Sequence, residues 1–200
     1  GHKTLAVNLS DLAAMGAEPD WALLNLVLPA ADSKWLEELS IGFFSLADRY
    51  NVTLVGGDTS DGPLNLTVTA GGWVPQGQAL CRSGARNGDL IYVSGTVGDA
   101  ALGLQLLSGP GGCLSDGENR VIERLRRPEP RTLLGKALRL WATAAIDLSD
   151  GLAADLAHVV AASGGLGAVI EEDCLPLSAE ALELRTRKQL IPIALGGGDD

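Results

Sequence analysis

The chain is poor in residues on which several classes of protein depend. Only 4% of its 200 residues are aromatic, and its three cysteines, Cys81, Cys113 and Cys174, are far apart and odd in number. That spacing matches neither a zinc site nor a disulfide framework, which favours a reduced, cytoplasmic chain. No apolar run approaches the roughly 18 residues of a membrane-spanning helix, and the first residues carry no secretory signal. We therefore expect a cytoplasmic protein with an aliphatic core and no membrane partner.

Basic charge is scarce as well. The 15 Lys and Arg residues are outnumbered by 25 Asp and Glu residues, which gives a net charge of -10. This balance argues against nucleic acid or an anionic membrane surface as a partner. An anionic substrate remains compatible with it if metal ions bridge the substrate to the protein. The sequence also lacks the P-loop pattern, the His-Arg-Asp and Asp-Phe-Gly motifs of protein kinases, and a Ser-His-Asp or Cys-His arrangement at a known spacing.

Hydrophobic periodicity predicts strands interleaved with helices, which is typical of an α/β or α+β architecture with mixed sheets flanked by helices. Short helical turns are expected at residues 11–16 before a first long helix. The expected strands are residues 4–8, 21–28, 52–55, 64–71, 90–93 and 168–171. The expected longer helices are residues 33–50, 99–107, 118–126, 131–141, 151–163 and 178–184.

A loss of hydrophobic rhythm between Pro75 and Gly88 predicts a domain boundary. We expect one domain over residues 1–76, a linker over 77–86 and a second domain over 87–200. The chain begins at Gly1 without an initiator Met and stops shortly after a Gly-rich turn. We therefore expect both domains to be incomplete parts of a longer protein.

Three short acidic motifs carry most of the functional information. They are Asn8-Leu9-Ser10-Asp11, Gly56-Gly57-Asp58-Thr59 and Ile146-Asp147-Leu148-Ser149-Asp150-Gly151. Two of them place Asp where a hydrophobic run ends, beside Gly and a hydroxyl residue. Carboxylates gathered at strand ends repel one another unless a cation lies between them. Mg²⁺ is the typical solution, because a hard cation takes carboxylate, phosphate and water oxygens together.

Each motif also has a structural interpretation that involves no ligand. Asp58 after two glycines is typical of a tight turn. Asp11 can cap a short helix, and Ser149 or Asp150 can be the N-cap of the helix expected at 151–163. Asp147 is in excess of what a cap needs, which favours a metal-bound phosphate at this strand-to-helix junction.

The cationic residues and histidines are weaker candidates. Arg82 in the expected linker suits a bidentate phosphate contact, and a solvated linker charge is the alternative. The basic cluster Arg124-Leu125-Arg126-Arg127 is explained by a helix C-terminal dipole. His158, inside a helix, is interpreted as a packing or surface residue. We predict no covalent catalytic nucleophile.

Together these segments resemble the thiamine-monophosphate kinase family. The similarity is carried by residues 1–19, which contain Ala6-Val7-Asn8-Leu9-Ser10-Asp11, and by the two later acidic motifs. Leu80-Cys81-Arg82-Ser83-Gly84-Ala85 adds a fourth matching segment. Order and spacing agree along essentially the whole chain. The family belongs to the aminoimidazole ribonucleotide synthetase-like superfamily, which implies a two-domain fold.

The resemblance implies an enzyme that transfers the γ-phosphoryl group of ATP to thiamine monophosphate with the help of Mg²⁺, as a homodimer. It implies Asp11, Asp58, Asp147 and Asp150 as metal ligands. It implies Gly57, Asp58, Arg82 and Ser149 as ATP contacts. Asp199 falls where the family has a Glu that faces the thiamine moiety. Asp is one methylene shorter, so this departure puts that substrate contact in question.

Two alternatives remain open. One is another ATP-using enzyme of the same superfamily, similar to selenophosphate synthetase or to the hydrogenase-maturation protein. The other is a non-catalytic metal-binding module.

Overall fold

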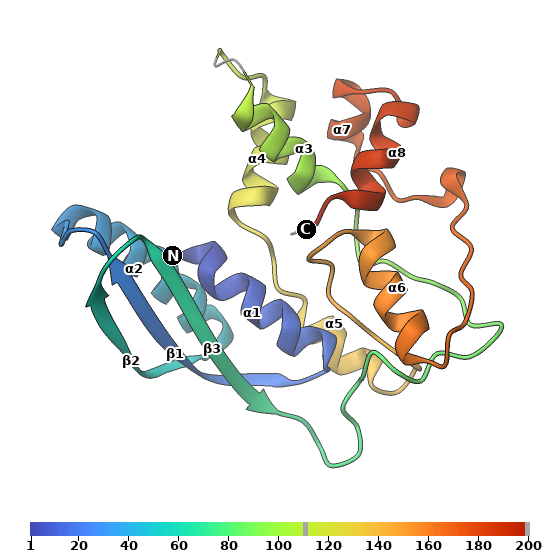
Figure 1. Ribbon diagram of the computed structural model, residues 1–200, viewed down its shortest axis with the longest axis horizontal. Helices are drawn as coiled ribbons and strands as arrows, with labels where there is room; N and C mark the ends of the chain where they lie inside the picture. Colours follow the sequence, from blue (N-terminus) through green and yellow to red (C-terminus); the bar gives the residue numbers. More distant parts are fainter. Residues whose placement is uncertain (110–111, 199–200) are drawn as a thin grey trace. The chain divides into compact units, whose positions relative to one another are not determined.

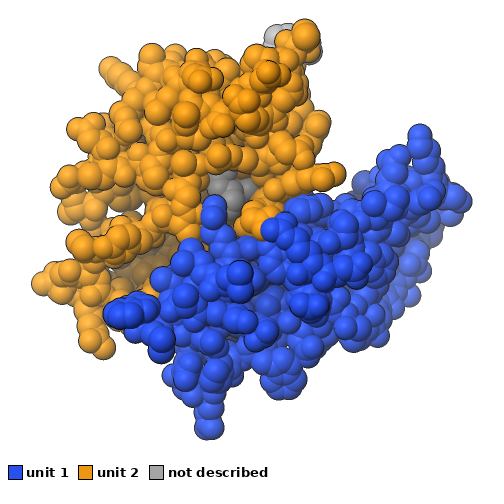
Figure 2. Space-filling view, turned by 180° about the vertical axis from the view of Figure 1, so that it is seen from behind, with its two compact units in different colours: residues 1–80, 130–141 blue, residues 81–129, 142–200 orange. Residues whose placement is uncertain are grey.

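The computed structural model describes residues 1–109 and 112–198. The chain divides into two compact units (Figure 2). Unit 1 contains residues 1–80 and 130–141, and unit 2 contains residues 81–129 and 142–200. Within the described ranges, no helix is long and apolar enough to cross a membrane.

Unit 1 is built on a three-stranded sheet (Figure 1). The strands β1 (Glu18–Leu28), β2 (Thr53–Asp61) and β3 (Asn65–Trp73) lie in the order β2-β1-β3. β1 and β2 are parallel and are joined by the helix α2 (Ser33–Tyr50), whereas β3 runs antiparallel to β1. This confirms the strands expected at 21–28 and 64–71. The strand expected at 52–55 is longer than predicted and continues through the glycine pair.

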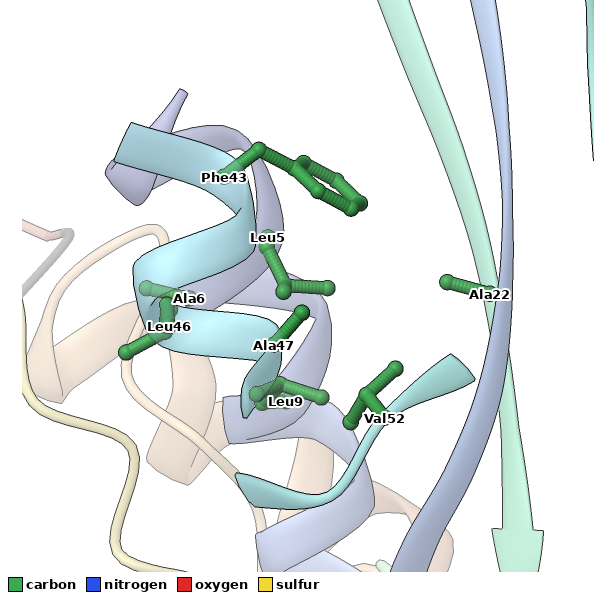
Figure 3. Packing of buried hydrophobic residues seen from close by; sticks show 8 residues of the cluster. All are labelled: Leu5, Ala6, Leu9, Ala22, Phe43, Leu46, Ala47 and Val52. Carbon is green, nitrogen blue, oxygen red and sulfur yellow. The ribbon is translucent and has the colours of Figure 1, made fainter. Parts of the chain in front are cut away.

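The core of unit 1 lies between this sheet and the helices α1 (His2–Ala14) and α2. Figure 3 shows aliphatic side chains of both helices facing Ala22 of β1, with Phe43 as the one aromatic ring among them. The eight buried residues of this cluster are Leu5, Ala6, Leu9, Ala22, Phe43, Leu46, Ala47 and Val52. The prediction of an aliphatic core is therefore confirmed for this unit.

Helix α2 follows closely from local sequence. The Asp32 side chain accepts hydrogen bonds from the backbone N–H groups of Lys34 and Trp35, at 3.0 and 3.2 Å, and so caps the helix start. Asn51, in the left-handed region with φ 54°, ends it.

The strand predicted at residues 4–8 is wrong, because this segment belongs to α1. Leu5 and Val7 lie two residues apart between the polar Thr4 and Asn8, which is the spacing of one face of a strand. The buried side chains, however, are Leu5, Leu9 and Ala13, together with Ala6. These positions recur at the helical spacing of four residues. The short helical turns expected at 11–16 are the last turn of the same helix.

Helix α5 (Thr132–Leu138) returns to unit 1 from far along the chain. The Tyr50 hydroxyl donates to the carbonyl oxygen of Pro130 at 2.8 Å, and Lys136 pairs with Glu18 at 3.1 Å. A side chain on Gly135 would collide with the backbone of Ala13, so α5 and α1 pack backbone to backbone here. The sequence predicted the helix but not its membership of unit 1.

Unit 2 is helical in its described parts. Its core contains Leu102, Val121, Ala181 and Leu190, which come from four different helices. Its helices are α3 (Asp99–Ser108), α4 (Asp116–Arg126), α6 (Leu152–Ala162), the 3-10 helix η1 (Glu172–Cys174), α7 (Ala179–Leu184) and α8 (Arg187–Gly196).

The strands predicted at 90–93 and 168–171 are wrong, since the described residues of unit 2 contain no strand. Both segments are apolar, but a strand also requires a partner for its backbone groups. Leu90, Tyr92 and Val169 are at least three-quarters exposed. The two apolar runs therefore predicted strands at segments that form no strand pairing with the described residues of unit 2.

Helix α8 was not predicted. Its sequence signal is the pair Thr186 and Gln189, because the Gln189 side chain accepts a hydrogen bond from the Thr186 backbone N–H at 3.0 Å. Pro192 inside the helix masks its periodicity.

Candidate functional site

The loop before α6 contains Asp147, Ser149 and Asp150, and a buried carboxylate organises its backbone. Asp155, in the first turn of α6, has only 2% of its surface exposed. Its Oδ2 accepts hydrogen bonds from the backbone N–H groups of Ser149 at 3.0 Å, Asp150 at 3.1 Å and Gly151 at 3.1 Å. Sequence reasoning missed Asp155 entirely.

This geometry corrects the capping interpretation of the loop. The N-cap of α6 is Gly151, with φ 107°, and no side chain caps the helix. Ser149 and Asp150 are both exposed, whereas Asp147 is half-buried. The side chains of Ser149 and Asp150 are therefore not used to start the helix, and their oxygens face solvent.

A glycine-rich segment lies directly against the same loop. A Cβ on Gly198 would collide with the Ser149 carbonyl oxygen, and a Cβ on Gly151 would lie 2.7 Å from the carbonyl carbon of Gly196. Such separations require glycine on both sides. The residues that precede Asp199 are thus in contact with Ser149 and Gly151. Asp199 itself lies outside the described residues.

In unit 1, the Gly56-Gly57-Asp58-Thr59 motif lies inside β2. The tight turn considered for Asp58 is wrong, because Asp58 pairs with Asn25 in the parallel ladder. Gly57 has φ 151°, and a Cβ on it would collide with the Leu24 carbonyl oxygen. The glycine is therefore required by the close approach of β1 and β2. Asp58 is exposed on this edge strand.

A hollow of about 560 Å³ adjoins this motif. Leu36 and Phe44 of α2 and Leu54 of β2 are among its apolar lining residues. Asp58 and Thr59 add polar groups to the lining. The motif thus borders a groove with both apolar and polar lining, rather than standing in an isolated turn.

Asp11 lies in the last turn of α1 and is exposed. It therefore ends a helix rather than opening one, which corrects the capping interpretation. Asp11 and Asp58 belong to unit 1, whereas Asp147 and Asp150 belong to unit 2. The prediction that all four share one site stays a prediction.

The chemistry of these donors fits Mg²⁺. Within residues 1–109 and 112–198, no group of three or more His, Cys, Asp or Glu side chains is placed to hold a metal ion. Mg²⁺, however, is usually held in phosphate-transfer sites by one or two carboxylates, with water and substrate phosphates as the other ligands. The exposed carboxylate of Asp150 and the half-buried one of Asp147 meet that requirement in unit 2.

Arg82 is exposed at the start of unit 2. Its segment is fixed by Ser163, at the C-terminal end of α6. The Ser163 hydroxyl accepts from the backbone N–H groups of Gly84 and Ala85, at 3.2 and 3.1 Å, and donates to the Arg82 carbonyl at 3.5 Å. The same helix α6 thus contacts the acidic loop at one end and the Arg82 segment at the other.

The segment after Arg82 contains a second fixed carboxylate. The hydroxyl of Thr143 donates to Asp89 at 2.6 Å, and the backbone N–H of Arg86 donates to it at 2.9 Å. These two donors, with the Arg86 charge, hold the pKa of Asp89 below its ordinary value.

Arg124 has a more specific role than the dipole interpretation gave it. It lies in the last turn of α4, and its guanidinium pairs with the fully buried Asp99 and bonds to Thr96. His158 is exposed on α6, in agreement with the surface role considered for it. Cys81, Cys113 and Cys174 are exposed and form no disulfide.

Known proteins match this chain along its whole length. Residues 1–74 match the family "AIR synthase related protein, N-terminal domain". The thiamine-monophosphate kinase of Salmonella typhimurium is 50% identical over 100% of this chain, which spans 61% of that relative's length. Thiamine monophosphate kinase from Aquifex aeolicus has a solved structure that is 36% identical. It superimposes with a TM-score of 0.88 over 98% of this chain and 67% of its own.

The chain belongs to the thiamine-monophosphate kinase family.

Two further structures of this family agree. The enzyme from Stenotrophomonas maltophilia K279a is 50% identical, with a TM-score of 0.94 over 100% of this chain and 64% of its own. AaThiL complexed with AMPPCP and TMP is 35% identical, with a TM-score of 0.86 over 97% of this chain and 63% of its own. The aminoimidazole ribonucleotide synthetase-like fold expected from the sequence is thereby confirmed.

Proposed function

We propose that the complete protein transfers the γ-phosphoryl group of ATP to thiamine monophosphate, with thiamine diphosphate and ADP as products. The main support is the 50% identity to thiamine-monophosphate kinases over the entire chain. AaThiL, 35% identical, is complexed with an ATP analogue and TMP, which supports both substrates.

Four carboxylates are proposed to hold Mg²⁺: Asp11 and Asp58 of unit 1, and Asp147 and Asp150 of unit 2. When bound there, Mg²⁺ would offset the negative charge of the substrate phosphates. We propose that Gly57, Asp58, Arg82 and Ser149 contact ATP. Asp199 is proposed to face the thiamine substrate.

The proposed reaction needs no covalent intermediate with the protein. A phosphate oxygen of thiamine monophosphate attacks the γ-phosphorus of ATP, a new P–O bond forms, and ADP leaves with the electrons of the broken bond. The chain's contribution is to align the two substrates and to offset their negative charge. The exposed Arg82 suits the second task, because a guanidinium binds phosphate oxygens through two parallel hydrogen bonds.

The oligomeric state, location and domain layout are proposals too. We propose a homodimer formed through the sheet of unit 1. Support comes from the apolar side chains exposed on its strands, with Trp73 70% and Val55 59% exposed. Three exposed cysteines that form no disulfide are compatible with a cytoplasmic location. The domains are proposed at 1–76 and 87–200, with a linker at 77–86.

The test is a product assay with the complete purified protein, ATP, Mg²⁺ and thiamine monophosphate. We expect equal amounts of thiamine diphosphate and ADP, and no product when EDTA removes the metal. Free thiamine should not replace the monophosphate as acceptor. ATP hydrolysis without thiamine diphosphate would favour another enzyme of the superfamily. Binding of metal without ATP or thiamine monophosphate would favour the non-catalytic module.

A further inference from the structure

The loop that leads into α6 is held by the protein's own carboxylate, Asp155. A helix start with free backbone N–H groups ordinarily attracts phosphate. Here the N–H groups of Ser149, Asp150 and Gly151 all donate to Asp155 Oδ2, at 3.0 to 3.1 Å. A substrate phosphate therefore cannot use these three donors while Asp155 keeps its place. The loop can therefore contact a ligand through its exposed side chains, those of Ser149 and Asp150.

We propose that Asp155 is a positioning residue for a divalent-cation site formed by Asp147 and Asp150. By fixing the backbone of the loop from inside, it directs the Asp150 carboxylate and the Ser149 hydroxyl to solvent. The inference rests on the proposed function. It adds Asp155, which lies outside the acidic motif of residues 146–151 and is not itself a proposed metal ligand.

Two features show that the loop has little freedom once Asp155 is in place. Asp155 also donates its backbone N–H to the Gly151 carbonyl at 3.0 Å, so side chain and backbone hold the same residue. On the other side, the backbone of Gly196 and Gly197 fills the space that any Cβ at Gly151 would need. Loss of the Asp155 charge weakens three hydrogen bonds to the loop backbone, and a loop that is held less firmly is costly to a site that depends on alignment.

Asp99 provides a matched control within the same unit. It is also a fully buried carboxylate at a helix start, and it accepts hydrogen bonds from Thr96, Ser178 and Arg124. It contacts none of the three loop amides. Loss of its charge should weaken unit 2 in a similar way without moving the loop.

The experiment compares Asp155→Asn and Asp99→Asn with the wild type in the complete protein. Mn²⁺ binding is measured by the electron paramagnetic resonance of the free ion, and Mg²⁺ half-saturation is measured during phosphoryl transfer at saturating substrates. Asp155→Asn is expected to weaken Mn²⁺ binding and raise the Mg²⁺ half-saturation by about 10-fold or more, as outer-shell changes do. Asp99→Asn is expected to leave both values unchanged while lowering the unfolding midpoint.

Unchanged Mn²⁺ affinity in Asp155→Asn, or an equal loss in Asp99→Asn, would overturn the proposal. If Asp155→Asn fails to fold, Asp155→Glu keeps the charge, moves it by one methylene, and should also weaken Mn²⁺ binding. A wild type that binds no Mn²⁺ overturns the cation site. A wild type that binds Mn²⁺ but makes no thiamine diphosphate contradicts the proposed function alone, because the Mn²⁺ comparison still decides the role of Asp155.

Discussion

Arg124 reaches the fully buried carboxylate of Asp99, 25 residues earlier in the chain, and pairs with its Oδ2. The Ser178 hydroxyl donates to the other oxygen of the same carboxylate and also caps α7 by accepting from the Ala181 N–H at 3.0 Å. One carboxylate therefore joins α3, α4 and α7. A buried charge of this kind is tolerated only because it is paired and fully hydrogen-bonded.

Replacement of Arg124 should therefore cost stability. We expect Arg124→Ala to lower the free energy of unfolding by about 2–3 kcal/mol, because Asp99 keeps its hydroxyl donors but loses its counter-charge. Urea denaturation of the variant and the wild type measures the difference. Arg126→Ala, in the same last turn and exposed, should change stability by less than about 0.5 kcal/mol. Equal losses in the two variants would restore the helix-dipole explanation.

Gly57→Ala should disrupt the centre of the β1–β2 pairing. The added Cβ would collide with the Leu24 carbonyl, and φ of 151° is itself unfavourable for alanine. We expect a loss of about 2–4 kcal/mol in unfolding free energy, from strain and displaced backbone together.

Gly77→Ala separates these two causes. Gly77 also has a positive φ, of 76°, but a Cβ there would meet nothing within 4 Å. Its substitution should cost about 1–2 kcal/mol from backbone conformation alone. Thermal unfolding of both variants is the measurement, and a Gly57 variant no less stable than the Gly77 variant would contradict the predicted collision.

Glu118 should make stability depend on pH at the start of α4. Its pKa is lowered because the backbone N–H of Ser115 bonds to its carboxylate at 2.8 Å, and the Ser115 hydroxyl adds a second bond at 2.9 Å. A folded-state pKa below the unfolded value of about 4.3 means that the unfolded chain binds more protons between the two values. The stabilisation is therefore present above about pH 4.3 and is lost as pH falls through the folded-state pKa.

Glu118→Gln tests this sign, since Gln preserves the reciprocal hydrogen bonds without a charge. We expect the wild type to be the more stable at pH 6 and the two proteins to converge at the lowest pH values that permit folding. Unfolding midpoints between pH 3 and 7 provide the comparison. A stability difference that is constant across this range would rule out the proposed titration.

Local signals predicted the parts of the fold that local physics decides. Asp32 followed by apolar residues at helical spacing predicted α2 almost to the residue, and alternation predicted β3. In the first residues of α1, the apolar positions fit both the strand period of two residues and the helix period of 3.6. Only their burial against the sheet shows that the helix period applies. The return of α5 to unit 1 depends on long-range contacts such as that between Tyr50 and Pro130. Residues so far apart in the sequence cannot be related by a local pattern.

The sequence predicts Asp147 and Asp150 as metal ligands, which stays a prediction, but it holds no signal for the role of Asp155. Asp147 and Asp150 stood out because they lie beside glycine and serine at the end of an apolar run. Asp155 resembles any acidic residue in the first turn of a helix. Its role depends on the sharp backbone bend at Gly151, which brings three N–H groups to one oxygen. Periodicity does not encode such a bend.

Substitution of Arg82 tests whether its guanidinium binds phosphate or is only a solvated charge. Its guanidinium makes no hydrogen bond or ion pair with another residue in the described ranges, so its substitution should not affect folding. We expect Arg82→Ala to raise the KM for ATP by about 10-fold or more, because a charge-assisted hydrogen bond to phosphate contributes about 1.5–3 kcal/mol.

Arg82→Lys keeps the charge but loses the planar fork, so it should lie between the wild type and Arg82→Ala. Steady-state kinetics with ATP varied at saturating thiamine monophosphate gives both values. Arg126→Ala controls for loss of one positive charge. An Ala variant with unchanged KM and kcat for ATP would return Arg82 to the role of a solvated charge.

Asp150→Asn should separate activity from stability most clearly. Asp150 is exposed and caps no helix, so removal of its charge should change the unfolding free energy by less than about 0.5 kcal/mol. If Asp150 is a Mg²⁺ ligand, the variant should lose at least about 10-fold in its rate of phosphoryl transfer. Added Mg²⁺ should then recover part of that loss. Asp147→Asn should lose activity in the same way.

The control for Asp150→Asn is Asp173→Asn, which removes the same charge from an exposed position in unit 2 outside the loop. It should retain wild-type rates at every Mg²⁺ concentration. Phosphoryl transfer from ATP to thiamine monophosphate across a Mg²⁺ series, beside the unfolding midpoint, measures all three variants. Because the carboxylates of the loop are not needed to start α6, a loss of activity without a loss of stability has a direct cause in ligand binding. Wild-type rates in both loop variants at low Mg²⁺ would instead leave residues 147–151 as an ordinary connection between an apolar segment and a helix.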